Sequence, residues 1–85
     1  MPSLHQINHP HKLAQALPLM QAEDAIVLVE QGVNLLQQPI QLTQPLYALK
    51  KDCQARAITP HATCTLIDHA QWVALTLEYD RVCSW

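Results

Sequence analysis

Short apolar runs alternate with helix-like patterns along the chain. Four of these runs predict strands: Ser3–Ile7, Ala25–Val29, Leu46–Leu49 and Cys64–Ile67. The second run, AIVLV, contains no polar residue, which indicates a strand that is buried on both faces. Strands that alternate with helices are typical of a parallel sheet with helices packed on its faces.

Helical patterns follow the first two predicted strands. His9 followed by Pro10 is typical of an N-cap with proline at the first helical position. Pro18 lacks the N–H that a helix interior needs, so we expect this helix to end or kink there. Gly32 allows a tight turn after the second strand. One helical face is predicted at Leu13, Ala16, Leu17 and Met20, and a short helix or helical turn begins at Val33, Leu35 and Leu36.

Two further helices are predicted in the second half of the chain. The first covers Lys51–Ile58. The second begins at a predicted capping box. In this motif the Asp68 side chain accepts a hydrogen bond from the backbone N–H of Gln71, and the Gln71 side chain accepts one from the backbone N–H of Asp68. Beyond this box Trp72, Thr76 and Tyr79 share one face, with Val73 and Leu77 beside them, and we expect the Trp72 face to lie in the core.

These elements predict one small α/β domain over residues 1–85, with a parallel sheet of four to five strands and helices on both faces. A fifth strand has to come from the tail, Arg81–Trp85, or from residues 38–44. The segment Gln37–Pro45 is polar and contains two prolines, so it is expected to be loop or edge structure.

Composition and charge exclude several classes of protein. Hydrophobic residues make up 49% of the 85 residues and charged residues 14%, which argues against a disordered tail and favours association with a partner. The five basic residues face seven acidic ones, and only Lys50 and Lys51 are adjacent, so direct nucleic-acid binding is not expected. A single glycine argues against glycine-rich nucleotide-binding loops.

The three cysteines, Cys53, Cys64 and Cys83, form no CxxC motif and predict neither a zinc knuckle nor a redox pair. The N-terminal stretch has no apolar signal core, and no run approaches membrane-spanning length. Reduced thiols in a cytoplasmic protein are therefore the simplest interpretation. No cofactor is expected.

Cys53 is the most interesting thiol, because it lies in the first turn of a predicted helix beside two lysines, where cations and the helix dipole favour a thiolate. Asp52 opposes this effect, and a small buried side chain against the sheet is the interpretation we favour. Cys64 is expected in the core. Cys83 is expected to be exposed, on a tail too mobile to hold a catalytic geometry.

Two other groups of polar residues are candidate sites. His5, His9 and His11 have a spacing that could recruit a metal, but we favour solvent-facing loop histidines and expect no metal site. Asp68 and His69 could form an acid–base pair, although Asp68 is better explained as a helix cap. No catalytic arrangement can be nominated from the spacing, so an enzyme activity of the chain by itself is not expected.

Trp85 is the last residue of the sequence. An exposed tryptophan is unfavourable unless something covers it, and tryptophan is enriched among interface anchors. We therefore expect Trp85 to be docked or to lie in an interface rather than on a frayed tail.

Four segments together resemble the TusB/DsrH family of sulfur-relay subunits: SLHQINHP (Ser3–Pro10), DAIVLVEQGV (Asp24–Val33), LYALKKDCQARAI (Leu46–Ile58) and LIDHAQWVALTLEYDRVCSW (Leu66–Trp85). The resemblance implies a DsrE/DsrF-like α/β fold in a cytoplasmic bacterial protein. It further implies a heterohexamer with TusC-like and TusD-like subunits, which passes persulfide sulfur toward 2-thiouridine at the tRNA wobble position. In the Dsr branch of the family the sulfur serves dissimilatory sulfur oxidation. In both branches the resemblance implies that the D-type or E-type subunit carries the principal sulfur-accepting cysteine.

The sequence departs from the family pattern at points that bear on function. Some DsrH-like members have a cysteine in the first helix, but Lys12–Met20 contains none. Cys53 lies where the family usually has an apolar residue, which favours a core role. Glu30-Gln31-Gly32 replaces a more usual acidic pair, and the stretch between Val33 and Pro45 looks shortened.

The leading hypothesis is therefore a non-catalytic subunit that completes a sulfur-transfer complex, and the missing first-helix cysteine favours the tRNA-thiolation branch. The alternatives are a persulfide carrier that uses Cys53, a DsrH-like subunit in sulfur oxidation, and a homo-oligomeric stand-alone module.

Overall fold

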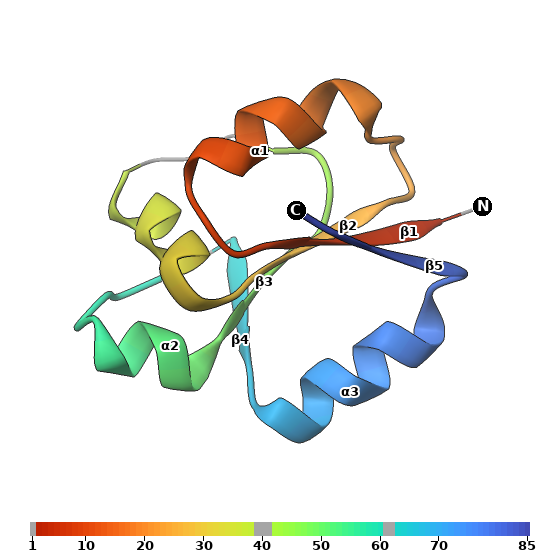
Figure 1. The fold of residues 1–85 in the computed structure, drawn as a ribbon. Coiled ribbons are helices and arrows are strands. Elements are labelled where there is room, and N and C mark those ends of the chain that lie inside the picture. The colour runs from red at the N-terminus through yellow and green to blue at the C-terminus, as the bar shows by residue number, and fades with distance from the viewer. Residues whose placement is uncertain (1, 39–41, 61–62) are drawn as a thin grey trace.

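The five strands form one sheet in the order β4-β3-β2-β1-β5, and every neighbouring pair runs parallel (Figure 1). The structure is a computed structural model that describes residues 2–38, 42–60 and 63–85. The strands are β1 (Ser3–Ile7), β2 (Ala25–Leu28), β3 (Leu46–Leu49), β4 (Cys64–Ile67) and β5 (Arg81–Ser84). The α-helices are α1 (His11–Ala16), α2 (Lys50–Ala55) and α3 (His69–Glu78), and two 3₁₀-helices complete the list, η1 (Leu17–Leu19) and η2 (Glu30–Gln37).

The strands predicted from the sequence are confirmed, and the tail supplies the fifth one. β5 pairs with β1 at the edge of the sheet, from Ser3 opposite Arg81 to Gln6 opposite Ser84. β2 is buried at all four positions, as its unbroken apolar run predicts. Of the Gln37–Pro45 segment, residues 39–41 lie outside the described residues, and 42–45 form no helix or strand.

The helices divide between the two faces of the sheet, and the chain topology explains this division. From β1 to β4 the chain moves in one direction across the sheet, and the connections contain α1, η1, η2 and α2. It then returns from β4 past the other strands to β5, and α3 lies in this connection. Because parallel crossovers are right-handed, a return in the opposite direction places its helix on the opposite face. Figure 1 shows α3 on the side away from α1.

Each face has its own hydrophobic core. The core beneath α1, η2 and α2, here called the α1-face core, contains twelve buried residues: Ile7, Leu13, Ala16, Ile26, Leu28, Val33, Leu36, Leu46, Ala48, Cys53, Ile58 and Cys64. The core beneath α3, here called the α3-face core, is smaller: Leu4, Ala25, Val27, Val29, Ile67 and Leu75. Alternation along β1 and β2 sends successive side chains to the two cores in turn.

Several helix boundaries differ from their predictions. Pro10 lies at the N-cap of α1 rather than at its first helical position, and the His9 side chain instead accepts from the His11 N–H at 3.4 Å. The α-helix ends at Ala16, and the chain continues as a 3₁₀-turn through Pro18, as its missing N–H predicts. α2 ends at Ala55, three residues before its predicted end.

The capping box of α3 is confirmed, but the buried face of the helix is only partly the predicted one. The Asp68 side chain accepts from the Gln71 N–H at 2.7 Å, and the Gln71 side chain accepts from the Asp68 N–H at 2.8 Å. Trp72 and Tyr79 pack against the α3-face core as expected. Leu75 is the buried residue of the helix, whereas Val73 and Leu77 are 48% and 81% exposed.

Gly32 makes the predicted tight turn, because its N–H donates to the Val29 carbonyl at 2.8 Å. The requirement for glycine has a different cause. A Cβ atom at this position would lie 2.0 Å from the carbonyl oxygen of Ile7, so only glycine permits the close approach of η2 to the end of β1. The left-handed conformation in this turn is adopted by Glu30, with φ 51°.

Candidate functional site

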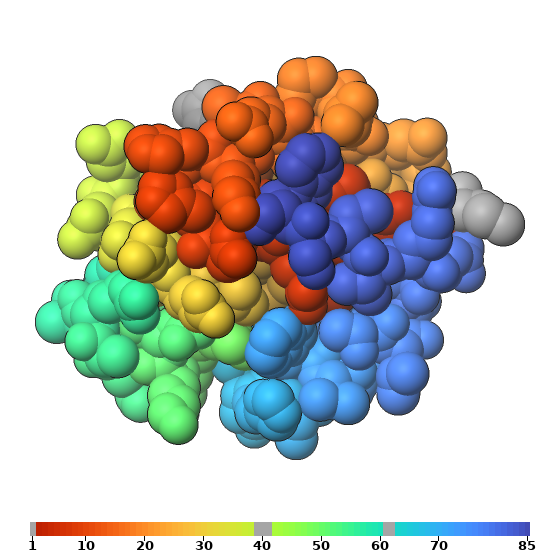
Figure 2. Space-filling model, in the orientation of Figure 1, coloured from red at the N-terminus to blue at the C-terminus, as the bar shows by residue number. Residues whose placement is uncertain are grey.

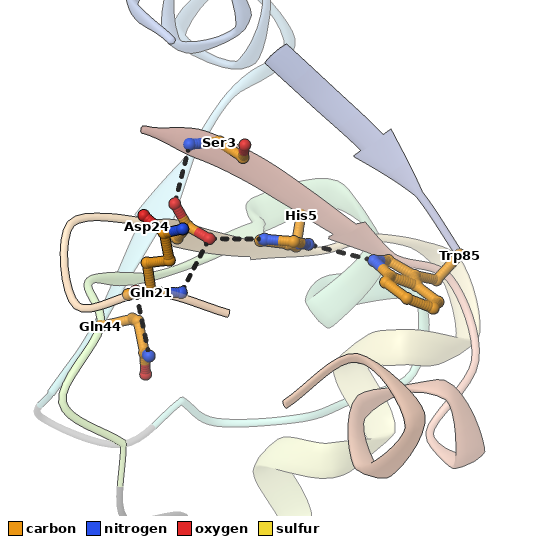
Figure 3. Close-up of polar contacts among 6 residues, drawn as sticks. All are labelled: Ser3, His5, Gln21, Asp24, Gln44 and Trp85. Carbon is orange, nitrogen blue, oxygen red and sulfur yellow. Dashed lines mark hydrogen bonds and ion pairs between the residues drawn. The ribbon is translucent and has the colours of Figure 1, made fainter. Parts of the chain in front are cut away.

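A buried polar network joins His5, Asp24 and Trp85, which come from β1, from the residue before β2 and from the residue after β5 (Figure 3). The His5 Nε2 atom lies 2.9 Å from Asp24 Oδ2, and the Trp85 Nε1 atom lies 3.1 Å from His5 Nδ1. The His5 and Trp85 rings are stacked, with centroids 6.2 Å apart. His5 is 4% exposed and Asp24 is 3% exposed.

The partners of His5 assign its proton. The indole Nε1–H of Trp85 is a donor only, so His5 Nδ1 must accept. The ring proton therefore resides on Nε2 and is donated to the Asp24 carboxylate. Both ring nitrogens of His5 are thus engaged inside the protein.

Asp24 is held in its charged form by three donors. Its carboxylate accepts from the Ser3 N–H at 2.9 Å, the Gln21 N–H at 3.0 Å and the His5 ring. Burial alone would raise the pKa of Asp24, but these hydrogen bonds outweigh burial and lower the pKa below its usual value. The carboxylate therefore ties the start of β1 to the turn before β2.

Parallel strand pairing brings these three residues together. Ser3, His5 and Ile7 point to the α1 face, and Cys83 lies opposite His5 on the neighbouring strand. The Trp85 N–H continues this pairing by donating to the Gln6 carbonyl at 3.0 Å, and its ring packs against the α1-face core. The prediction that Trp85 is docked is confirmed, and its role in an interface remains a prediction.

A cavity of about 150 Å³ lies beside the network and is lined in part by Arg81, Cys83 and Trp85. Cys83 is half-buried on an ordered strand, so the expectation of a mobile tail is wrong. Because the nitrogens of His5 are committed to Asp24 and Trp85, the ring has no free nitrogen to accept a proton from the Cys83 thiol. The arrangement fixes the position of β5 and does not form a cysteine–histidine catalytic pair.

The other two thiols lie in the α1-face core. Cys53 is 2% exposed, and burial together with the charge of Asp52 raises the pKa of its thiol, an effect that Arg56 only partly offsets. Burial, with Cys53 nearby, raises the pKa of Cys64 to about 11. An activated thiol at Cys53 is therefore not supported, and Cys53 and Cys64 both have the surroundings of core side chains.

The three histidines whose spacing could recruit a metal, His5, His9 and His11, do not come together in the fold. His5 is buried, which corrects the expectation of a solvent-facing loop residue. The His9 and His11 rings contact each other, with centroids 4.4 Å apart. Across residues 2–38, 42–60 and 63–85, no group of three His, Cys, Asp or Glu side chains is arranged to hold a metal ion.

Sequence reasoning missed Asp24 as a partner of His5. Its only local signal is a carboxylate directly before an unbroken apolar strand, where a charged group has to find donors if it is buried. The Asp68–His69 pair is explained by the helix cap, since Asp68 accepts from the Gln71 N–H.

The fold and this network define a small doubly wound α/β protein whose fifth strand is fixed to the first by a buried His–Asp–Trp network. None of the described helices is long and apolar enough to cross a membrane. The family model described as "DsrH like protein" matches residues 8–82. The chain is also 32% identical over 71 residues to Protein TusB of Pectobacterium carotovorum subsp. carotovorum (strain PC1), covering 73% of this chain and 75% of that protein. The chain therefore belongs to the TusB/DsrH family.

Proposed function

We propose that the chain is a non-catalytic subunit of a cytoplasmic sulfur-relay complex of the TusBCD type. In this proposal it assembles with TusC-like and TusD-like subunits in a heterohexamer, and the complex passes persulfide sulfur toward 2-thiouridine at the tRNA wobble position. The chain itself contacts neither tRNA nor a membrane. The observation that carries the proposal is membership of the TusB/DsrH family, by a match over residues 8–82.

The surroundings of the thiols support a non-catalytic role. A sulfur carrier needs an accessible thiol of low pKa, but Cys53 and Cys64 are buried and their pKa values are raised. Cys83 is more accessible, yet the neighbouring His5 has no free nitrogen with which to activate it. These features favour a subunit that supports the thiol of a partner, and they do not favour the alternative of a persulfide carrier at Cys53.

The α3 side of the molecule supports assembly with a partner. Leu77 and Val73 on α3 are 81% and 48% exposed, and Val82 on β5 is 41% exposed. Val82 belongs to the same side, because it is paired with Leu4 of the α3-face core. Exposed apolar side chains of this size on a chain with few charges are typical of surfaces that another subunit covers. We therefore assign this side to the TusC-like or TusD-like partner.

Co-expression with the C-type and D-type subunits of the same genome tests the assembly, with native mass spectrometry as the readout. We expect a stable mixed complex for the natural chain. Leu77→Glu should abolish it without unfolding the chain, because the side chain contributes little to either core. Leu19→Glu, at a 66% exposed position on η1, is the matched control and should assemble normally.

A chain that stays alone, as a monomer or a homo-oligomer, would contradict the proposal and support the stand-alone module. If Leu77→Glu and Leu19→Glu assemble equally well, the α3 side is not the interface.

A genetic experiment tests the absence of catalysis. Deletion of the gene should lower 2-thiouridine in tRNA, as measured by mass spectrometry of digested tRNA. Because no step is assigned to its thiols, a chain with Cys53→Ala, Cys64→Ala and Cys83→Ser should restore the modification. If this variant does not restore 2-thiouridine, the single variant Cys53→Ala is tested next. A folded Cys53→Ala chain that also does not restore the modification would favour a persulfide carrier at Cys53. A deletion with no effect on 2-thiouridine would favour the sulfur-oxidation branch.

A further inference from the structure

A second pocket, of about 590 Å³, lies at the carboxyl ends of β3 and β4 and is separate from the His5 network. Leu49 and Ile67, the last residues of these neighbouring strands, are paired with each other and line the pocket. The first turns of α2 and α3 form its sides. Its volume is within the range of small-molecule sites, about 300–1,000 Å³.

The topology of the sheet creates this pocket. The chain leaves β3 toward the α1 face, where Cys53 of α2 joins the α1-face core, and leaves β4 toward the other face, where Leu75 of α3 joins the α3-face core. Two neighbouring connections that diverge in this way leave a crevice at the carboxyl ends of their strands. This is the position at which open α/β sheets bind ligands. Figure 2 shows a notch in the surface between the green α2 segment and the light-blue start of α3.

The charged side chains around the pocket differ in whether they already form hydrogen bonds within the protein. Asp52 accepts from the Glu30 N–H at 2.8 Å, and Asp68 accepts from the Gln71 N–H at 2.7 Å. Lys50 and Lys51 are exposed at the rim, and within the described part of the chain no hydrogen bond or ion pair holds either ammonium group. Each carboxylate thus already binds a backbone N–H, whereas neither ammonium group has a partner within the described residues.

Taken together, the geometry points to a binding site for a small organic anion, a phosphate or carboxylate attached to an apolar group. Lys50 and Lys51 bind the anionic group, and the apolar group lies on Leu49 and Ile67. His69 at the start of α3 and Gln54 of α2 are further polar groups at the sides. This inference goes beyond the proposed function and does not depend on it, because the site is formed by this chain alone.

Phenyl phosphate, titrated into the full chain and followed by ¹⁵N–¹H NMR, is the probe that combines both chemical features. We expect saturable shifts of the Lys50, Lys51 and His69 amides. Inorganic phosphate, which lacks the apolar group, and benzyl alcohol, which lacks the charge, should each bind more weakly.

The double variant Lys50→Gln/Lys51→Gln should raise the dissociation constant about tenfold, since each lost charge at a partly exposed site weakens binding several-fold. Lys12→Gln is the charge-matched control, because Lys12 lies on α1 outside the pocket and should leave the constant unchanged. The inference is overturned by an equal constant in the double variant, by shifts that do not saturate, or by phosphate alone binding as well as phenyl phosphate. The experiment needs no partner subunit, so its failure is distinguishable from failure of the complex to assemble.

Discussion

The two faces of the sheet each fix a tryptophan to β1, but in different surroundings. On the α1 face, Trp85 donates to His5, which is buried and donates in turn to the buried Asp24. On the α3 face, Trp72 donates at 2.9 Å to Gln6, a half-buried residue whose amide donates to the exposed Ser84. We call the first network closed, because His5 and Asp24 are buried, and the second open, because Gln6 is half-buried and Ser84 is exposed.

The difference extends to the packing around each tryptophan. Twelve buried residues and several helical segments complete the α1-face core, whereas α3 alone covers the other face and leaves Leu77 exposed. The larger core thus lies on the α1 face, where Leu19 of η1 is also exposed, and the most exposed leucine, Leu77, lies on the α3 face. A subunit that must fold and then assemble needs both a core and exposed apolar surface, and in this molecule the larger core and the most exposed leucine lie on opposite faces of the sheet.

Thiol accessibility gives the largest expected contrast, because two cysteines lie inside the closed face and one lies at its margin. We expect iodoacetamide to label Cys83 at least about a hundredfold faster than Cys53 or Cys64, since these two react only when the core opens. Peptide mass spectrometry at increasing reaction times gives the three rates. Similar rates for Cys53 and Cys83 would show that the α1 face is not closed in solution.

Asp24→Ala should cause the largest loss of stability. It removes the acceptor of three hydrogen bonds and leaves the buried donors of Ser3 and His5, together with the more exposed Gln21 N–H, without this partner. We expect the free energy of unfolding to fall by about 3 kcal/mol, measured by urea denaturation followed by circular dichroism. Asp80→Ala, at an exposed position, should change it by less than about 0.5 kcal/mol. Equal losses would mean that the Asp24 network contributes no more than a surface carboxylate.

The sequence predicts the features that depend on local contacts better than those that depend on contacts between distant residues. Elements set by neighbouring residues were predicted well: the unbroken run of β2, the end of α1 before Pro18 and the capping box at Asp68. Each depends on contacts within a few positions, which local patterns report directly.

The candidate site was not predicted, because its residues are distant in sequence. His5 lies 19 positions from Asp24 and 80 positions from Trp85. Only the order of the strands brings them together, and it also places Leu49 beside Ile67 at the second pocket. The requirement for Gly32 of η2 has the same origin, since a Cβ atom there would clash with the carbonyl of Ile7 at the end of β1.

A matched pair of substitutions compares the two tryptophan networks directly. Trp85→Phe leaves the buried Nδ1 of His5 without a donor, so we expect a loss of about 1.5 kcal/mol. Trp72→Phe leaves the amide oxygen of Gln6 without a donor, but this residue is half-buried and can turn to water, so about 0.5 kcal/mol is expected. Urea denaturation followed by circular dichroism avoids the change in tryptophan fluorescence. A larger loss for Trp72→Phe would reverse the assignment of the closed and open faces.

The smallest expected effect is the change in stability on acidification, because it involves only the part of the Asp24 contribution to stability that depends on its ionisation. Hydrogen bonds lower the pKa of Asp24 in the folded chain despite its burial, so the unfolded chain binds this proton more readily. The stabilisation is therefore fully present above the unfolded pKa of about 4 and is lost as the pH falls through the lower, folded pKa. The stability difference between the natural chain and Asp24→Asn should shrink over this acidic range, and Asp80→Asn is measured alongside as a reference at an exposed position. Urea midpoints at a series of pH values from neutral to strongly acidic give both curves, and a difference for Asp24→Asn that grew on acidification would contradict the charged, hydrogen-bonded state of this carboxylate.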